Sequence, residues 1–113
     1  EARAFVDAAL AEAEPDAVIL TASDARTFAL WYAVYGLGRR SDIAPVNVNL
    51  LGFDWYRRTV AATHPDLPPV HAAAAAPWIA AVARQRPTYA AETLNLGTEL
   101  DEARVGVLTK LNP

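Results

Sequence analysis

The sequence predicts a small three-layer α/β sandwich, in which helices cover both faces of a mostly parallel sheet of about four strands. Two observations predict it. Short apolar runs rich in β-branched residues alternate with longer segments of helical periodicity, and 53% of the 113 residues are hydrophobic while 20% are charged. A helix between consecutive strands implies a right-handed crossover and parallel pairing. We therefore expect a single soluble α/β domain over residues 1–113.

The N-terminal elements follow from side-chain spacing. Residues 2–13 carry apolar side chains three and four positions apart, which predicts an amphipathic helix that ends before Pro15. Residues 17–22 form a short apolar run with a β-branched centre, typical of a central strand that is buried on both faces. Ser23 and Asp24 are the N-cap candidates of the helix that follows.

Glycines mark the end of the second expected helix, and an alternation of apolar and polar side chains marks the second expected strand. The second helix ends near Gly36 or Gly38, and residues 44–51 alternate apolar and amide side chains, which predicts a strand with one apolar face. Asp54 is placed to cap a helix over 55–63. The remaining expected elements are a proline-rich loop over 64–69, a helix over 72–84 with Pro77 inside it, a strand over 88–94 and an edge strand over 104–111 that can run antiparallel.

Polar side chains gather where the first and third expected strands end. If the second and third strands flank the first, as in a Rossmann-like sheet, a crevice forms at their carboxyl ends. Backbone N–H groups at the start of the following helix can hold an anion or a sugar hydroxyl there. The candidate ligand-binding residues are Ser23, Asp24, Thr27, Thr93 and Asn95.

Helix capping is the plainer interpretation of Ser23 and Asp24, because Ser and Asp are the commonest N-caps. No GxGxxG or Walker sequence follows the strand, so we expect no nucleotide cofactor. One alternative is a free-standing small-molecule-binding module or enzyme that uses the crevice, with Asp24 or Glu92 as acid/base or hydrogen-bonding group. Another is a purely structural interaction domain.

Aromatic residues recur at helical spacing in the second helix and again near residue 55. Flat rings with polar tips can stack on a sugar or a peptide, but such spacing more often marks a buried face. We therefore expect the rings to pack in the core, with one or two at its rim. The aromatic residues concerned are Phe28, Trp31, Tyr32, Tyr35, Trp55 and Tyr56.

The residue inventory does not favour catalysis by this chain. There is no cysteine, and His64 and His71 lack the spacing of a helical metal site, so we expect no metal ion. Ser23 and Ser41 are the only serines and neither lies in a G-x-S-x-G elbow, so we expect no catalytic residues. The net charge of −3 gives no electrostatic reason to expect nucleic acid as a partner.

One stretch of 40 residues carries a family resemblance. Its parts are Val18-Ile19-Leu20-Thr21, Asp24, Thr27-Phe28, Leu30-Trp31-Tyr32, Asp42, Val46-Asn47, Leu50-Leu51 and Trp55-Tyr56. Their order and spacing resemble the C-terminal extracytoplasmic domain of bacterial multi-spanning membrane proteins of the GT-C, protein O-mannosyltransferase-like type, a domain long classed as of unknown function. Arg26 stands where that family has a second aspartate, and Ser23 where it has a glycine, so only Asp24 carries over.

The resemblance implies a non-catalytic accessory domain on the extracytoplasmic face of a bacterial membrane. The parent would be a polytopic glycosyltransferase that uses a lipid-linked sugar. Position 1 is not Met, and we expect the chain to be excised from such a longer membrane protein. Its expected partners are the membrane-embedded part of the same chain and a sugar or peptide acceptor.

Overall fold

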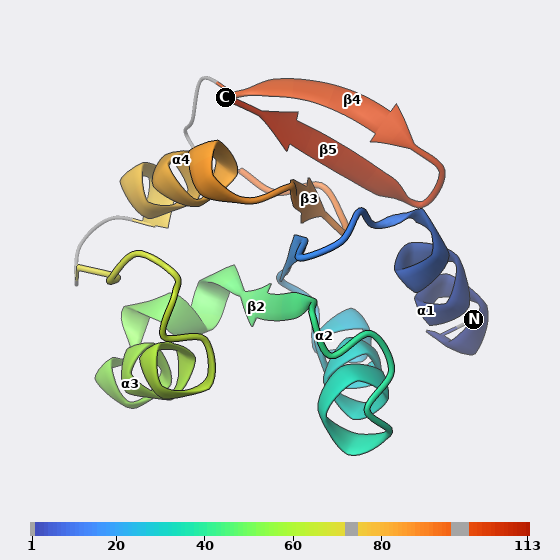
Figure 1. The fold of residues 1–113 in the computed structure, drawn as a ribbon, viewed down its shortest axis with the longest axis horizontal. Coiled ribbons are helices and arrows are strands. Elements are labelled where there is room, and N and C mark those ends of the chain that lie inside the picture. Colours follow the sequence, from blue (N-terminus) through green and yellow to red (C-terminus); the bar gives the residue numbers. More distant parts are fainter. Residues whose placement is uncertain (1, 72–74, 96–99) are drawn as a thin grey trace.

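Five strands form one mixed sheet. The structure is a computed structural model that describes residues 2–71, 75–95 and 100–113. β2 and β3 both pair parallel with β1, whereas β5 pairs antiparallel with β3 and with β4. The strands are β1 (Val18–Thr21), β2 (Ala44–Asn47), β3 (Thr88–Ala90), β4 (Asp101–Val105) and β5 (Leu108–Asn112), in the spatial order β2-β1-β3-β5-β4 (Figure 1).

Helices cover both faces of the sheet. α1 and α2 pack on one face, and α3 and α4 on the other (Figure 1). Alternate residues of β1 serve the two layers: Ile19 contacts the first pair of helices, and Val18 and Leu20 contact the second. All three side chains are fully buried, so β1 is the centre of the core. The helices are α1 (Ala2–Glu12), α2 (Asp24–Trp31), α3 (Asp54–Thr63) and α4 (Ala75–Gln85).

The prediction of a mostly parallel, Rossmann-like sheet of about four strands is wrong, because the sheet has five strands and two of its pairings are antiparallel. The expected edge strand 104–111 is part of a hairpin, in which Val105 pairs with Leu108 across a turn at Gly106. Gly106 has a φ of 60°, a left-handed conformation that glycine adopts without steric cost. Because apolar and polar residues keep alternating through this turn, the sequence of residues 104–111 looks like that of a single strand.

β2 and β3 are shorter than predicted. β2 ends at Asn47, because its side-chain Oδ1 accepts the N–H groups of Asn49 at 2.8 Å and Leu50 at 3.1 Å. These bonds start the 3₁₀ helix Val48–Gly52 where the alternating pattern predicts more strand. β3 ends at Ala90, and residues 91–95 after it are not part of a strand.

The third helix begins differently from its prediction. α3 starts at Asp54 itself and Phe53 occupies the N-cap position, so the prediction of Asp54 as the cap is wrong. The Asp54 carboxylate instead pairs with Arg58 one turn later. Of the last predicted helix, residues 72–74 lie outside the described residues, and α4 begins at Ala75.

Candidate functional site

A carboxylate of the chain itself lies at the strand ends, where the sequence predicts a crevice. β1 lies between β2 and β3, so three parallel strands end at one edge of the sheet. Glu92, just after β3, places its Oε2 where it accepts the N–H of Ala22 at 2.7 Å, the N–H of Ser23 at 2.8 Å and the Ser23 hydroxyl at 3.1 Å. A helix N-terminus is where an anion binds, and here Glu92 provides that anion.

The surroundings of Glu92 favour its ionised form. Partial burial is the largest single influence and raises the pKa of the Glu92 carboxyl. The bonds from Ser23 and Ala22, together with the charge of Arg26, outweigh burial and hold that pKa below its usual value. Glu92 therefore acts as a hydrogen-bond acceptor that joins the end of β3 to the start of α2.

The structure brings only part of the predicted ligand-binding set together. Ser23 occupies the N-cap position of α2, but its hydroxyl binds Glu92 rather than the helix backbone. Asp24 is exposed in the first turn of α2, and Thr93 and Asn95 are exposed in the loop after β3. None of these last three side chains forms a hydrogen bond with another described residue, so they remain available to solvent.

Thr27 lies inside the protein, in a buried polar network. Its hydroxyl shares a hydrogen bond of 2.6 Å with the Thr21 hydroxyl and accepts the side-chain N–H of Asn47 at 3.0 Å. The Asn47 backbone N–H in turn donates to the Tyr56 hydroxyl at 3.0 Å. The network ties α2, β1, β2 and α3 together at one end of the sheet, and it leaves the Thr27 hydroxyl no free surface.

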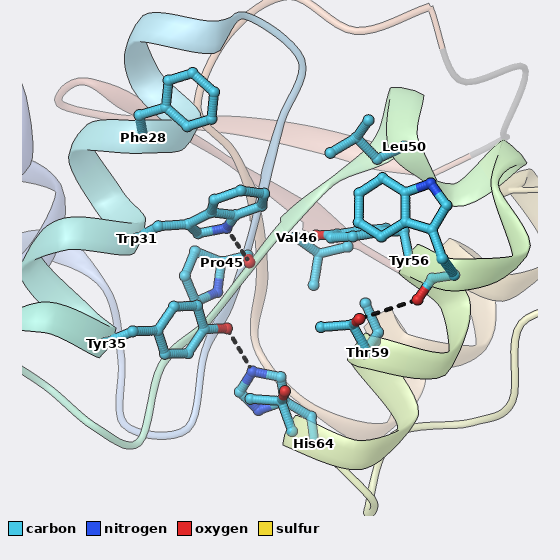
Figure 2. A pocket seen from close by; sticks show the side chains of 12 residues that line it. Phe28, Trp31, Tyr35, Pro45, Val46, Leu50, Tyr56, Thr59 and His64 are labelled. Atoms are coloured by element: carbon cyan, nitrogen blue, oxygen red, sulfur yellow. Dashed lines mark hydrogen bonds between the residues drawn. The ribbon is translucent and has the colours of Figure 1, made fainter.

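A cavity of about 440 Å³ opens between α2 and α3, over the outer edge of β2. We call it the aromatic groove. Phe28, Trp31 and Tyr35 stand on one side of it and Leu50, Tyr56, Thr59 and His64 on the other, with Pro45 and Val46 between them (Figure 2). Its complete lining is Phe28, Trp31, Tyr35, Pro45, Val46, Leu50, Trp55, Tyr56, Thr59, Val60, Thr63 and His64.

Two stacked rings join the walls of the groove. The Trp31 and Tyr56 rings lie 6.0 Å apart at 29°. Their polar atoms are already bonded, since the Trp31 Nε1–H donates to the Pro45 carbonyl at 3.1 Å and the Tyr56 hydroxyl accepts the Asn47 N–H. These contacts engage the outward-facing carbonyl of Pro45 and the outward-facing N–H of Asn47, and Pro45 has no N–H of its own. They therefore block two positions at which another strand could pair with the edge strand β2.

The rings around the groove are more exposed than the sequence predicts. Phe28 is 58% exposed, Tyr35 48% and Trp55 53%, and Tyr32, outside the groove, is 65% exposed. The prediction that all but one or two of these rings pack in the core is therefore wrong. Helical spacing places Phe28 and Trp31 of α2 on one face with Tyr35 of the π-helical turn Tyr32–Gly36 that continues it, and this face extends past β2, the last strand on that side of the sheet. Among the described residues no further element covers Phe28 and Tyr35 there.

One end of the groove is closed by a polar pair. Tyr35 Oη and His64 Nε2 share a hydrogen bond of 2.7 Å. Burial, with a smaller contribution from the charge of Arg86, lowers the pKa of His64, and burial raises the pKa of Tyr35. Both side chains are therefore neutral at pH 7, and since no Asp, Glu, Lys or Arg lines the groove, the groove carries no formal charge.

Sequence reasoning named Trp55 and Tyr56 of the second wall but missed Thr59, Thr63 and His64. Trp55, Thr59 and Thr63 are spaced four residues apart, which places them on one face of α3, and this signal is readable from the sequence. The contribution of His64 had no such signal, because it depends on contact with Tyr35, 29 residues away. Among the described residues no group of three or more His, Cys, Asp or Glu side chains is placed to hold a metal ion.

Comparison with known proteins identifies a family. No curated protein and no solved structure matched the chain. In the described part of the chain, no helix has the length and apolar character needed to cross a membrane. The family model of TMEM260-associated domain 2 matches residues 2–96, which include the whole stretch that carries the sequence resemblance and every residue of the groove. The chain therefore belongs to the TMEM260-associated domain 2 family.

Proposed function

We propose that the chain is a non-catalytic accessory domain of a multi-spanning membrane protein of glycosyltransferase type, and that it binds its partner in the aromatic groove. The observation that carries this proposal is a preformed, uncharged groove of about 440 Å³ walled by half-exposed aromatic rings. Pockets of this size lined by aromatic side chains are typical of binding sites, and exposed rings provide large contact area at low entropic cost.

The distribution of polar groups supports binding rather than chemistry. In the crevice, the Ser23 hydroxyl and the Glu92 carboxylate are bonded to each other, and Thr27 is enclosed in its network. An enzyme that used this crevice would first have to displace Glu92 from two backbone N–H groups. The groove presents mainly ring faces, which hold a ligand, and its one imidazole, His64, is already hydrogen-bonded to the Tyr35 hydroxyl.

The residues behind the sequence resemblance support the same site. Six of them line the groove, and Thr27 and Asn47 form the network beneath it. The family name associates the domain with a transmembrane protein, which fits a parent embedded in the membrane. The partner is then the membrane-embedded part of the parent or its acceptor, on the extracytoplasmic face. The six are Phe28, Trp31, Val46, Leu50, Trp55 and Tyr56.

Site-specific photocrosslinking in the full-length parent, in its membrane, tests the proposal. A benzoylphenylalanine at position 55 should crosslink to the membrane-embedded part of the parent or to its acceptor, identified by mass spectrometry. The same group at position 32, which is at least as exposed but lies outside the groove, is the matched control and should not. Equal crosslinking from both positions, or a parent reading frame without membrane spans, would refute the assignment.

Two further measurements test whether the domain is catalytic and on which side of the membrane it lies. Residues 1–113 mixed with a lipid-linked sugar and an acceptor peptide should transfer no sugar, and transfer above background would show that the domain is catalytic. The chain itself has no cysteine, so in a parent freed of its other cysteines a single cysteine at exposed Asp66 reports the side of the membrane on which the domain lies. We expect a membrane-impermeant maleimide to label it in intact cells, and labelling only after lysis would place the domain inside.

A further inference from the structure

The three tryptophans of the chain differ in one respect. The Trp31 indole N–H donates to the carbonyl of Pro45 at 3.1 Å, and the Trp78 indole N–H donates to the carbonyl of Pro68 at 2.6 Å. Both indoles thus bind the carbonyl of a proline residue of the chain itself. The third, Trp55, lines the aromatic groove, is 53% exposed, and its indole N–H has no acceptor among the described residues.

We propose that the aromatic groove binds an uncharged, proline-containing polypeptide segment in an extended, polyproline-II-like conformation. The Trp55 ring packs against a proline ring of the segment, and the Trp55 indole N–H donates to a backbone carbonyl of the segment, as the other two indoles do within the chain. The inference rests on the proposed function of the groove as a binding site and specifies its ligand.

The edge of β2 argues for this mode of binding. A peptide that added to the sheet as a further strand would need free backbone groups on β2, but Pro45 has no N–H and its carbonyl is bonded to Trp31, while the Asn47 N–H is bonded to Tyr56. A polyproline-II segment needs no backbone pairing with a sheet. It also loses little conformational entropy on binding, and aromatic-lined grooves are its usual receptors.

Charge and hydrogen bonding disfavour other ligands. The lining carries no formal charge at pH 7, which excludes recognition of an anionic sugar or a charged peptide by ion pairing. A sugar needs several polar partners for its hydroxyls, yet three of the four hydroxyls in the lining are engaged: Thr59 donates to the Trp55 carbonyl, Tyr35 is paired with His64, and Tyr56 accepts the Asn47 N–H. Only the Thr63 hydroxyl has no partner among the described residues. The unpaired indole N–H of Trp55 matches one strong acceptor, such as the carbonyl of a tertiary amide.

The test is a titration of ¹⁵N-labelled residues 1–113 with N-acetyl-hexaproline amide, followed by NMR. The three indole N–H signals report separately on the three tryptophans. We expect the Trp55 signal to shift most on binding, the Trp31 signal, also from the groove, to shift less because its N–H is already bonded to Pro45, and the Trp78 signal, outside the groove, to stay in place. An N-acetyl-(Gly-Ser)₃ amide of equal length should shift none of them, since it lacks proline rings and pays more entropy on binding.

Three variants separate the ring from its donor. Trp55→Phe keeps a ring but removes the N–H, and should weaken hexaproline binding about fivefold, the value of one hydrogen bond. Trp55→Ala should abolish it. Tyr32→Ala removes a ring of similar exposure outside the groove and should leave the affinity unchanged.

The outcomes distinguish this inference from the proposed function. If hexaproline leaves the Trp55 signal unmoved, or if Trp55→Phe binds as tightly as the wild type, the proline assignment is wrong. A groove that responds to maltotriose or to decyl maltoside but not to hexaproline would overturn the assignment and leave the groove standing as a binding site. If no probe shifted the Trp55 signal and position 55 gave no specific crosslink, both the proline assignment and the proposed binding function of the groove would be wrong.

Discussion

The Glu92 carboxylate accepts the backbone N–H of Ser23 at 2.8 Å, although the two residues are 69 positions apart. The same oxygen also accepts the N–H of Ala22 and the hydroxyl of Ser23. The contact joins the end of β3 to the start of α2 and satisfies donors that a helix N-terminus leaves unpaired. The sequence alternative assigns Glu92 to acid/base or ligand-binding chemistry, whereas the structure uses it to hold two elements together.

Replacement of Glu92 by glutamine should destabilise the fold. Glu92→Gln removes the charge from an oxygen that accepts three hydrogen bonds, and we expect a loss of about 1 kcal/mol in the free energy of unfolding, since the site is partly open to solvent. Urea denaturation measures it. Asp24→Asn is the matched control, because Asp24 lies at the same helix start without such a bond, and should cost a few tenths of a kcal/mol through the helix dipole. Equal losses would contradict the assignment.

The same carboxylate predicts a dependence of stability on pH. Because the folded pKa of Glu92 lies below its usual value of 4.5, the unfolded chain takes up its proton first as the pH falls. The contribution of Glu92 is complete above 4.5 and is lost as the pH falls through the folded pKa. Urea midpoints from pH 7 to pH 2.5 should therefore converge for the wild type and Glu92→Gln at the acid end. Asp42, whose pKa is lowered to about 2, also loses stabilisation in acid, but it is present in both proteins and does not affect their difference. If the difference between the two urea midpoints stayed the same at every pH, the proposed contribution of the ionised Glu92 would be wrong.

Removal of the Thr27 hydroxyl should be costly because it belongs to a buried polar network. Thr27→Val keeps the shape of the side chain but leaves the Asn47 side-chain N–H without its acceptor at a position 3% exposed. We expect a loss of about 2 kcal/mol. The double variant Thr21→Val/Thr27→Val should cost less than the sum of the two single variants, because the hydroxyls bond each other. Strict additivity in denaturation experiments would show that the network is not coupled.

The Tyr56 hydroxyl should protect one amide of the edge strand. Tyr56→Phe removes the acceptor of the Asn47 N–H, so we expect a loss of about 1 kcal/mol and faster hydrogen exchange at that amide. The Ala44 amide, which donates to the Ala17 carbonyl inside the sheet, provides the internal control. After correction for the change in global stability, its exchange should be unaffected. Parallel acceleration of both amides would mean that the hydroxyl has no local role.

Part of this architecture is readable from the sequence because it depends on neighbours along the chain. The periodicity of residues 2–13 locates α1, and the apolar run 17–22 locates β1 as the central strand. Helical crossovers of sufficient length predict the parallel pairing of β1 with β2 and β3, whereas the position of β1 between them was only a condition of the predicted crevice. The hairpin at Gly106 escaped prediction because an alternating pattern has the same period on both sides of a tight turn.

The candidate site depended on tertiary structure for a different physical reason. Helical spacing puts Phe28 and Trp31 of α2 on one face with Tyr35 of the π-helical turn after it, but burial depends on whether another element covers that face, and β2 is the last strand on that side. Likewise, the anion at the start of α2 comes from Glu92 through folding rather than from a ligand. Short-range pattern thus determined which side chains share a face, and only the packing of segments distant in sequence decided which faces stay open to bind.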